Sequence, residues 1–144
     1  MDELELLALL TGVRKTPIFV CHVSTRLRLI LRASTTHVLL SPETVRKQEA
    51  KHRGSSADLY RLAPTIIASE FVRFDAENRR VICIWHAPKN ELGKVKSYKA
   101  VVKATRTGHE LFLMSVHRVD KTSVRSVFKR TLSLDDWERK SGVR

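Results

Sequence analysis

The sequence predicts an α+β protein in which helices pack on one face of an antiparallel sheet of about four strands. Three observations lead to this expectation. Helical patterns fill much of the chain before residue 70, four alternating segments joined by turn signals follow, and a further helical pattern comes after them. The 144 residues are 42% hydrophobic and 29% charged, a balance typical of a single globular domain over 1–144.

The chain opens with a short predicted helix over residues 2–12. Acidic residues occupy its first turn, where they favour the positive end of the helix dipole. We expect Leu4, Leu7 and Leu10 to form its apolar stripe, and Gly12 to end it. The start at Met1 with a helix of its own favours a free-standing protein.

Three short strands are expected next, at residues 18–23, 26–32 and 37–40. The first and third are compact apolar runs. In the second, leucines alternate with arginines, the period of a half-buried strand.

Two helices are expected after these strands. Ser41 can cap the first helix and Pro42 fits its first turn, so that helix runs from there to about residues 51–52. The second helix begins at Ser56 or Ala57. Pro64 lies inside its pattern and predicts a kink or a division into two short pieces.

The second half of the chain predicts an antiparallel meander. Residues typical of turns join neighbouring segments, around Asn78 and at Gly108. A helix follows with its apolar side through Val124, Val127 and Phe128. The tail 132–144 shows no period, but its apolar residues are expected to dock on the body. The expected strands are 70–74, 79–86, 97–105 and 109–116, and the expected helix is 121–131.

The charge balance favours a polyanionic partner. Lys and Arg number 27 against 15 for Asp and Glu, which gives a net charge of +12. RNA, DNA and an anionic membrane surface would all suit such a protein. No glycine-rich phosphate loop, nucleophile elbow or HExxH motif is present, and acidic residues are too scarce in the predicted strands for a carboxylate metal site. No metal or other cofactor is therefore expected.

The cysteines and the apolar runs favour a cytoplasmic protein. Cys21 and Cys83 are isolated and each lies in an apolar segment, where a buried free thiol is expected. No run approaches the ~18 apolar residues of a membrane-spanning helix. The N-terminal apolar stretch lacks the positive start and the cleavage site of a secretory signal.

Two groups of residues could carry chemistry. Lys51-His52-Arg53 places an imidazole between two cations at the predicted end of a helix. A histidine there can exchange a proton with a bound phosphodiester. The same cluster also suits a helix C-terminus, where cations offset the dipole, and both interpretations stay open.

The second group lies on the last two predicted strands. Lys99, Lys103 and Thr105 share one face of their strand, opposite a small apolar face. Ser115 and His117 are two residues apart, so their side chains are expected on the same face of the next strand. The register between the two strands is open, so Lys103 comes near His117 only if the strands splay or a bulge intervenes. The alternative is a solvated sheet face with ordinary lysines.

The ordered stretches VLLSPETVRKQEAKH, LYRLAPTIIASEFVRF, YKAVVKAT and ELFLMSVHR, followed by a basic helix, resemble a family of phage and toxin nucleases. That family groups barnase, EndoU, the colicin tRNases and RelE, and is often called the BECR fold. The resemblance covers residues 37–131, which we expect to form the nuclease-like core. It implies two helices followed by a four-stranded antiparallel sheet.

The resemblance also implies roles for particular residues. His52 resembles a catalytic or phosphate-contacting residue, and Lys103 resembles the cation that stabilises the pentavalent phosphate. Ser115 corresponds to the family's phosphate-binding Ser or Thr, and His117 is a second acid–base candidate. Barnase-like members use a glutamate as base, and the corresponding strands here carry no acidic residue except Glu110. A histidine would then serve as the base.

The function implied is metal-independent cleavage of RNA through a 2′,3′-cyclic phosphate, by a toxin-like enzyme for which tRNA is a candidate target. Such a toxin would need an inhibitor or immunity protein. Two alternatives stay open: a basic protein that binds nucleic acid without cutting it, and a phage effector that binds a host protein. Further residues are expected to contact nucleic acid: Lys51, Arg53, Lys99, Thr105, Arg118, Lys121 and Arg125.

Overall fold

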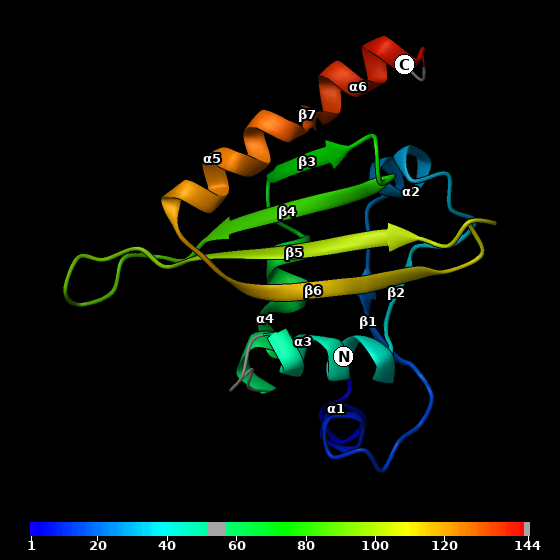
Figure 1. The fold of residues 1–144 in the computed structure, drawn as a ribbon, viewed down its shortest axis with the longest axis vertical. Helices are drawn as coiled ribbons and strands as arrows, with labels where there is room; N and C mark the ends of the chain where they lie inside the picture. The colour runs from blue at the N-terminus through cyan, green and yellow to red at the C-terminus, as the bar shows by residue number, and fades with distance from the viewer. Residues whose placement is uncertain (52–56, 143–144) are drawn as a thin grey trace.

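The computed structural model describes residues 1–51 and 57–142 and has α+β architecture (Figure 1). Within those ranges the helices are α1 (Glu3–Leu10), α2 (Thr25–Ile30), α3 (Pro42–Lys51), α4 (Ala57–Ile67), α5 (Lys121–Arg130) and α6 (Leu134–Ser141). The strands are β1 (Ile18–His22), β2 (His37–Leu40), β3 (Phe71–Asp75), β4 (Arg80–His86), β5 (Ser97–Ala104), β6 (Leu111–Val119) and β7 (Leu132–Ser133).

All of these strands join one mixed sheet in the order β1-β2-β6-β5-β4-β3-β7. The expected antiparallel meander is its centre, strands β3 to β6. The expectation of about four antiparallel strands was too small, since seven strands pair in the described ranges and β2 runs parallel to β6. The additional strands are short and distant in sequence from their neighbours, so no local turn signal predicts their pairing.

The segment expected as a strand at 26–32 is helix α2, which corrects that prediction. The Ser24 side chain caps it by accepting a hydrogen bond from the Leu27 backbone N–H at 3.1 Å. Leu27, Ile30 and Leu31 are buried, at the three- and four-residue spacing of a helix face. The alternation of leucine and arginine was therefore incidental to the burial pattern.

The first helix buries a different stripe from the one expected. Leu6 and Leu9 are buried, whereas Leu4 is 79% exposed. In a short helix made mostly of leucines, several stripes fit the helical period, and tertiary packing decides which one faces inward.

The helix pair after β2 forms as expected. The Ser41 hydroxyl caps α3 by accepting a hydrogen bond from the Thr44 backbone N–H at 3.2 Å. Helix α4 is one element that continues through Pro64 rather than two pieces. Tyr60, Ala63 and Ile66 are buried on its inner face, and this packing compensates the hydrogen bond that proline cannot make.

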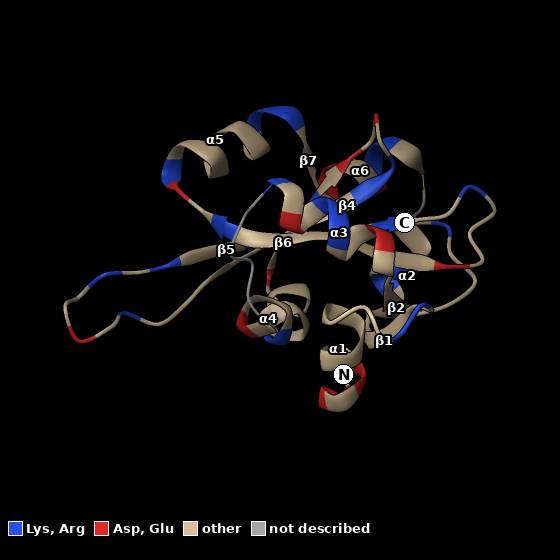
Figure 2. Cartoon of the chain, turned by 60° about the horizontal axis from the view of Figure 1, so that its bottom comes forward, with Lys and Arg blue, Asp and Glu red and all other residues tan. Residues whose placement is uncertain are grey.

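Helices cover the two faces of the sheet unequally. Figure 2 shows α1 and α4 on one side of the sheet and α5 on the other. The main core lies on the α4 side and includes Val102 and Leu113 of the central strands. A smaller core lies under α5, where Val127 packs with Ile82 and Val101. Phe128, expected in the core, is 42% exposed and lies beneath the Arg73 guanidinium at 4.4 Å.

The C-terminal tail docks on the body, as its apolar residues suggested. Leu132 enters β7, which pairs with β3, and Leu134 and Trp137 of α6 pack against the main core. The Trp137 and Phe74 rings lie 4.6 Å apart. Arg26 of α2 pairs with Asp135 at 2.6 Å and with Glu138, which ties α6 to α2.

Candidate nucleic-acid interface

Several of the expected site residues meet on the face of the sheet that bears α5, on strands β5 and β6. We call this the open face; Lys99, Ser115 and His117 are each partly exposed on it. Lys99 in β5 lies directly opposite His117 in β6, and Val101 lies opposite Ser115. Side chains opposite each other on one sheet face are about 5 Å apart at Cβ. Lys103 lies on the same face as Lys99, farther along β5. The lysines, the serine and the histidine therefore share one surface.

A bulge in β6 produces this grouping. Val101 pairs with Ser115 but Val102 pairs with Leu113, so Met114 is an additional residue in β6. The bulge shifts the parity of the strand, which puts Phe112, Ser115 and His117 on the same face. It also brings Lys99, not Lys103, opposite His117. Lys103 pairs with Phe112 instead.

Helix α3 is anchored beside Ser115 and His117. Among the described residues, strand β2 pairs with β6 only at Leu111 and Phe112, so it offers no partner to the Val116 backbone N–H. That N–H instead donates a hydrogen bond to Gln48 Oε1 at 2.8 Å. Gln48 is buried although it is polar, because this bond replaces the missing strand partner. Lys51, the last residue of α3, is exposed. His52 and Arg53, both named from the sequence, lie outside the described residues.

Lys99 occupies an unusual environment for a lysine. It is only partly exposed, and burial lowers the pKa of its ammonium group. The positive charges of Arg80 and Arg130 lower that pKa further. A lysine of this kind gives up its proton more readily than an ordinary surface lysine, which suits either proton transfer or the binding of a negative phosphate.

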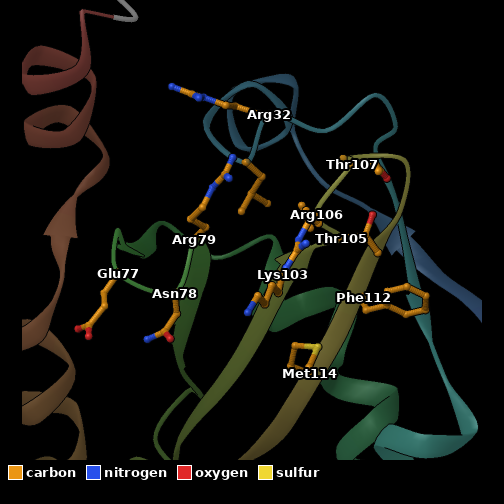
Figure 3. A pocket seen from close by; sticks show the side chains of 13 residues that line it. Arg32, Glu77, Asn78, Arg79, Lys103, Thr105, Arg106, Thr107, Phe112 and Met114 are labelled. Carbon is orange, nitrogen blue, oxygen red and sulfur yellow. The ribbon is translucent and has the colours of Figure 1, made fainter.

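One end of the open face forms a cationic pocket of about 770 Å³. Lys103 and Thr105 line it, as do Phe112 and Met114 on its apolar side (Figure 3). Sequence reasoning missed three further cations in its wall, which come from three separate turns: Arg32, Arg79 and Arg106. Glu77 is the one acidic side chain among the described lining residues, and Figure 3 shows it pointing away from Lys103.

Strained backbone supports this pocket. Arg32 and Arg79 have φ of 54° and 52°, and among the described residues no other non-glycine has a positive φ. A left-handed conformation costs an ordinary residue about 1–2 kcal/mol, and such strain often gathers at functional sites. Gly108 fixes the turn beside Arg32, because a Cβ there would lie 2.4 Å from the Arg32 carbonyl oxygen.

The other end of the sheet holds a second cationic pocket, of about 790 Å³. It brings together three cations that were named from the sequence, Arg118, Lys121 and Arg125, and adds Lys96. Asp120 also lines it, but its carboxylate caps α5 by accepting the Ser123 backbone N–H at 2.7 Å, which lowers the pKa of Asp120. The β6 strand reaches Val119, so His117 and Arg118 lie within it rather than after it.

The missed residues had weak sequence signals. Arg79 follows Asn78 in a turn where a left-handed residue is common, but that position is usually glycine or asparagine. Arg32 ends the expected strand 26–32, a segment that forms helix α2 and the turn after it. His86, also in the wall of the second pocket, pairs with Ser97 at 2.6 Å across β4 and β5, and only the register reveals this.

The described residues contain no group of three or more His, Cys, Asp or Glu side chains placed to hold a metal ion. Nor do they contain a helix both long and apolar enough to cross a membrane. Comparison of the chain with models of protein families, with curated proteins and with solved structures finds no match.

Proposed function

We propose that this protein is a metal-independent RNA endonuclease that cleaves through a 2′,3′-cyclic phosphate. The observation that carries the proposal is the grouping of Lys99, Lys103, Ser115 and His117 on one open sheet face, with a cationic pocket at each end. The order α3, α4 and then a four-stranded meander agrees with what the resemblance to the barnase, EndoU, colicin and RelE group implies. It supports the proposal independently of the side chains.

The residues have complementary chemistry for such a reaction. Attack of a ribose 2′-hydroxyl on the adjacent phosphorus needs a base, an acid for the leaving oxygen, and cations for the developing negative charge. His117 can exchange protons near neutral pH. Lys99, whose pKa is lowered by burial, faces it across the strands and supplies positive charge or a proton. The Ser115 hydroxyl can donate a hydrogen bond to a phosphate oxygen on the same face.

The pockets would extend the contact along the RNA backbone. Each end of the face carries several Lys or Arg side chains and one carboxylate in the described part of its wall. Phosphate contacts of this kind dominate affinity for nucleic acid. The proposal includes the toxin-like role, with tRNA as a candidate target and an inhibitor protein as a required partner.

The experiment is cleavage of total tRNA and of a generic RNA in EDTA by the wild type and by alanine variants. We expect His117→Ala to lower the rate by about 10²–10⁴-fold, the usual contribution of an acid–base group. Lys103→Ala and His52→Ala should also abolish most cleavage. The products should end in a cyclic phosphate.

Matched controls separate the site from general charge. His109→Ala removes an exposed histidine in the β5–β6 turn, and Lys140→Ala removes an exposed cation of α6. Both should cleave like the wild type. No cleavage by the wild type, with salt-sensitive RNA binding retained, would overturn the nuclease proposal in favour of a protein that binds RNA without cutting it.

A further inference from the structure

An exposed aromatic cluster lies beside the cationic pocket, at the β1–β2–β6 end of the open face. The rings of Phe19, His22 and His37 contact one another edge to face. The Phe19 centroid lies 5.1 Å from that of His22 and 5.3 Å from that of His37, and the two histidine centroids lie 4.6 Å apart. Phe19 is 36% exposed although it lies within a strand. Exposed rings gathered in one contact group, rather than scattered singly, are typical of a binding surface.

The sheet register joins this cluster to the pocket. Phe19 lies opposite Leu39, Leu39 opposite Phe112, and Phe112 opposite Lys103. One row of side chains on one face therefore leads from the aromatic cluster to a lysine of the pocket. Met114, 42% exposed at the bulge, lies beside Phe112 and lines the same pocket.

The two parts of this row suit the bases and the phosphates of a single-stranded RNA. Arg79, Arg106 and Lys103 offer positive charge to phosphates, and Figure 3 shows them around the same pocket as Phe112. Aromatic rings beside such a groove offer flat faces on which bases stack. A duplex keeps its base faces covered by stacking, so only an unpaired base could use the rings.

We infer that the β1–β2–β6 end of the open face binds unpaired nucleotides of the RNA, with one base on Phe19, another on Phe112, and their phosphates on the arginines of the pocket. This inference rests on the proposed function and narrows its substrate to RNA that is single-stranded next to the cleaved bond. A loop or an unpaired end would meet that requirement.

The experiment measures binding of a fluorescent single-stranded decamer in which every 2′-hydroxyl is methylated. Such RNA cannot form the cyclic phosphate, so binding is measured without cleavage. Phe19→Ala should weaken binding by at least about fivefold, the lower range for loss of one stacked base. Phe19→Trp should retain it. A duplex of the same length should bind less tightly than the single strand.

The matched control is Phe71→Ala. Phe71 is 52% exposed and its ring contacts His86, but it lies in β3, on the far side of the meander from Phe19. Its loss should leave binding of the decamer unchanged. Circular dichroism of each variant checks that the fold is retained.

The outcomes separate the two proposals. Equal effects of Phe19→Ala and Phe71→Ala, or tighter binding of the duplex, overturn the inference and leave RNA cleavage standing. Binding that depends on Phe19 in a protein that cuts no RNA supports the inference and overturns the nuclease. Absence of any RNA binding overturns both, and capture of a protein through the Phe19 cluster would then identify the true occupant.

Discussion

At the scale of single residues, Lys99 carries its proton in surroundings that disfavour a positive charge. Its side chain is partly buried on the open face, and two arginines lie near enough to lower its pKa below the ordinary value of 10.5. Residues retained at a cost to stability are often functional. Lys99 thus offers a test of whether the open face is a site or only a solvated surface.

We predict that Lys99→Met stabilises the protein at pH 7 while lowering RNA cleavage. A lysine whose pKa is lower in the folded state destabilises the fold whenever it is protonated, so the penalty is complete below the folded pKa and disappears as the pH rises toward 10.5. After allowance for solvent screening, the gain should be a few tenths to about 1 kcal/mol. Urea unfolding at pH 7 measures it.

A loss of stability at pH 7 would contradict this account of Lys99. The methionine is unbranched and similar in length, so it retains the packing of the lysine stem. The stabilisation should also shrink when unfolding is measured at pH values rising through 10.5, because the lysine then loses its proton in the folded state before it does so in the unfolded chain.

At the scale of elements, the β3–β4 turn holds Arg79 in a conformation better suited to glycine. Asp75 organises this turn by accepting hydrogen bonds from Asn78 Nδ2 at 2.9 Å and from Arg80 Nε at 3.0 Å. Burial alone would raise the pKa of Asp75, but these hydrogen bonds and the positive charge of Arg80 lower it below its ordinary value. These bonds hold the turn in the conformation that places Arg79 in the pocket wall.

We predict that Arg79→Gly leaves stability unchanged or raises it by up to about 1 kcal/mol, because glycine adopts positive φ without strain but loses more entropy on folding. RNA binding should weaken at the same time, since one cation leaves the pocket. Thermal unfolding and RNA titration at low salt measure the two effects. A large destabilisation, or unaltered RNA binding, would contradict this assignment of Arg79.

The elements also differ in how far local sequence predicts them. Helix α3 has its cap, its proline and its acidic first turn in adjacent positions, and it was predicted with nearly its observed bounds. The prediction of a strand at the position of α2 was wrong, because a six-residue segment contains too few turns to distinguish a helix from a strand by its hydrophobic period. The burial of Leu27, Ile30 and Leu31 together identifies it only once the core is formed.

At the scale of the whole molecule, the C-terminal helix α6 connects two parts of the fold that are distant in sequence. It follows β7 at one edge of the sheet and pairs with α2, which follows β1 at the other edge. Helix α6 contacts the main core through Trp137 and reaches α2 through the ion pairs of Arg26. The apolar contact should contribute more than the ion pairs, because Arg26 and Asp135 are largely exposed to solvent and pairs of this kind contribute at most about 1 kcal/mol.

We predict that Trp137→Ala lowers the free energy of unfolding by about 1–3 kcal/mol, since it removes a partly buried ring that packs at a tilt against Phe74. Arg26→Ala should cost less than about 1 kcal/mol. Urea unfolding followed by circular dichroism compares the two variants. A larger cost for Arg26→Ala would mean that the ion pairs, rather than the ring contact, hold α6 in place.

The candidate site was predictable in part. Lys99 and Lys103 could be placed on one face of their strand, and Ser115 and His117 on one face of theirs, because the alternation of side chains along each strand is local. The positions of the lysines relative to His117 could not be predicted, because the bulge at Met114 decides which lysine lies opposite His117. Arg32, Arg79 and Arg106 come from turns far apart in the sequence, so no pattern within any one segment brings them to one pocket.

The sequence by itself determined the α+β class, the central meander, the capped helix α3 and the strongly basic character of the chain. Each of these depends on signals within a few residues: side-chain alternation, caps, turns and composition. Only the tertiary structure decided the seven-stranded mixed sheet, the helical state of α2, the bulge in β6 and the open face with its aromatic cluster. These features are stabilised by contacts between residues that are distant in the chain, so no short segment of the sequence indicates them.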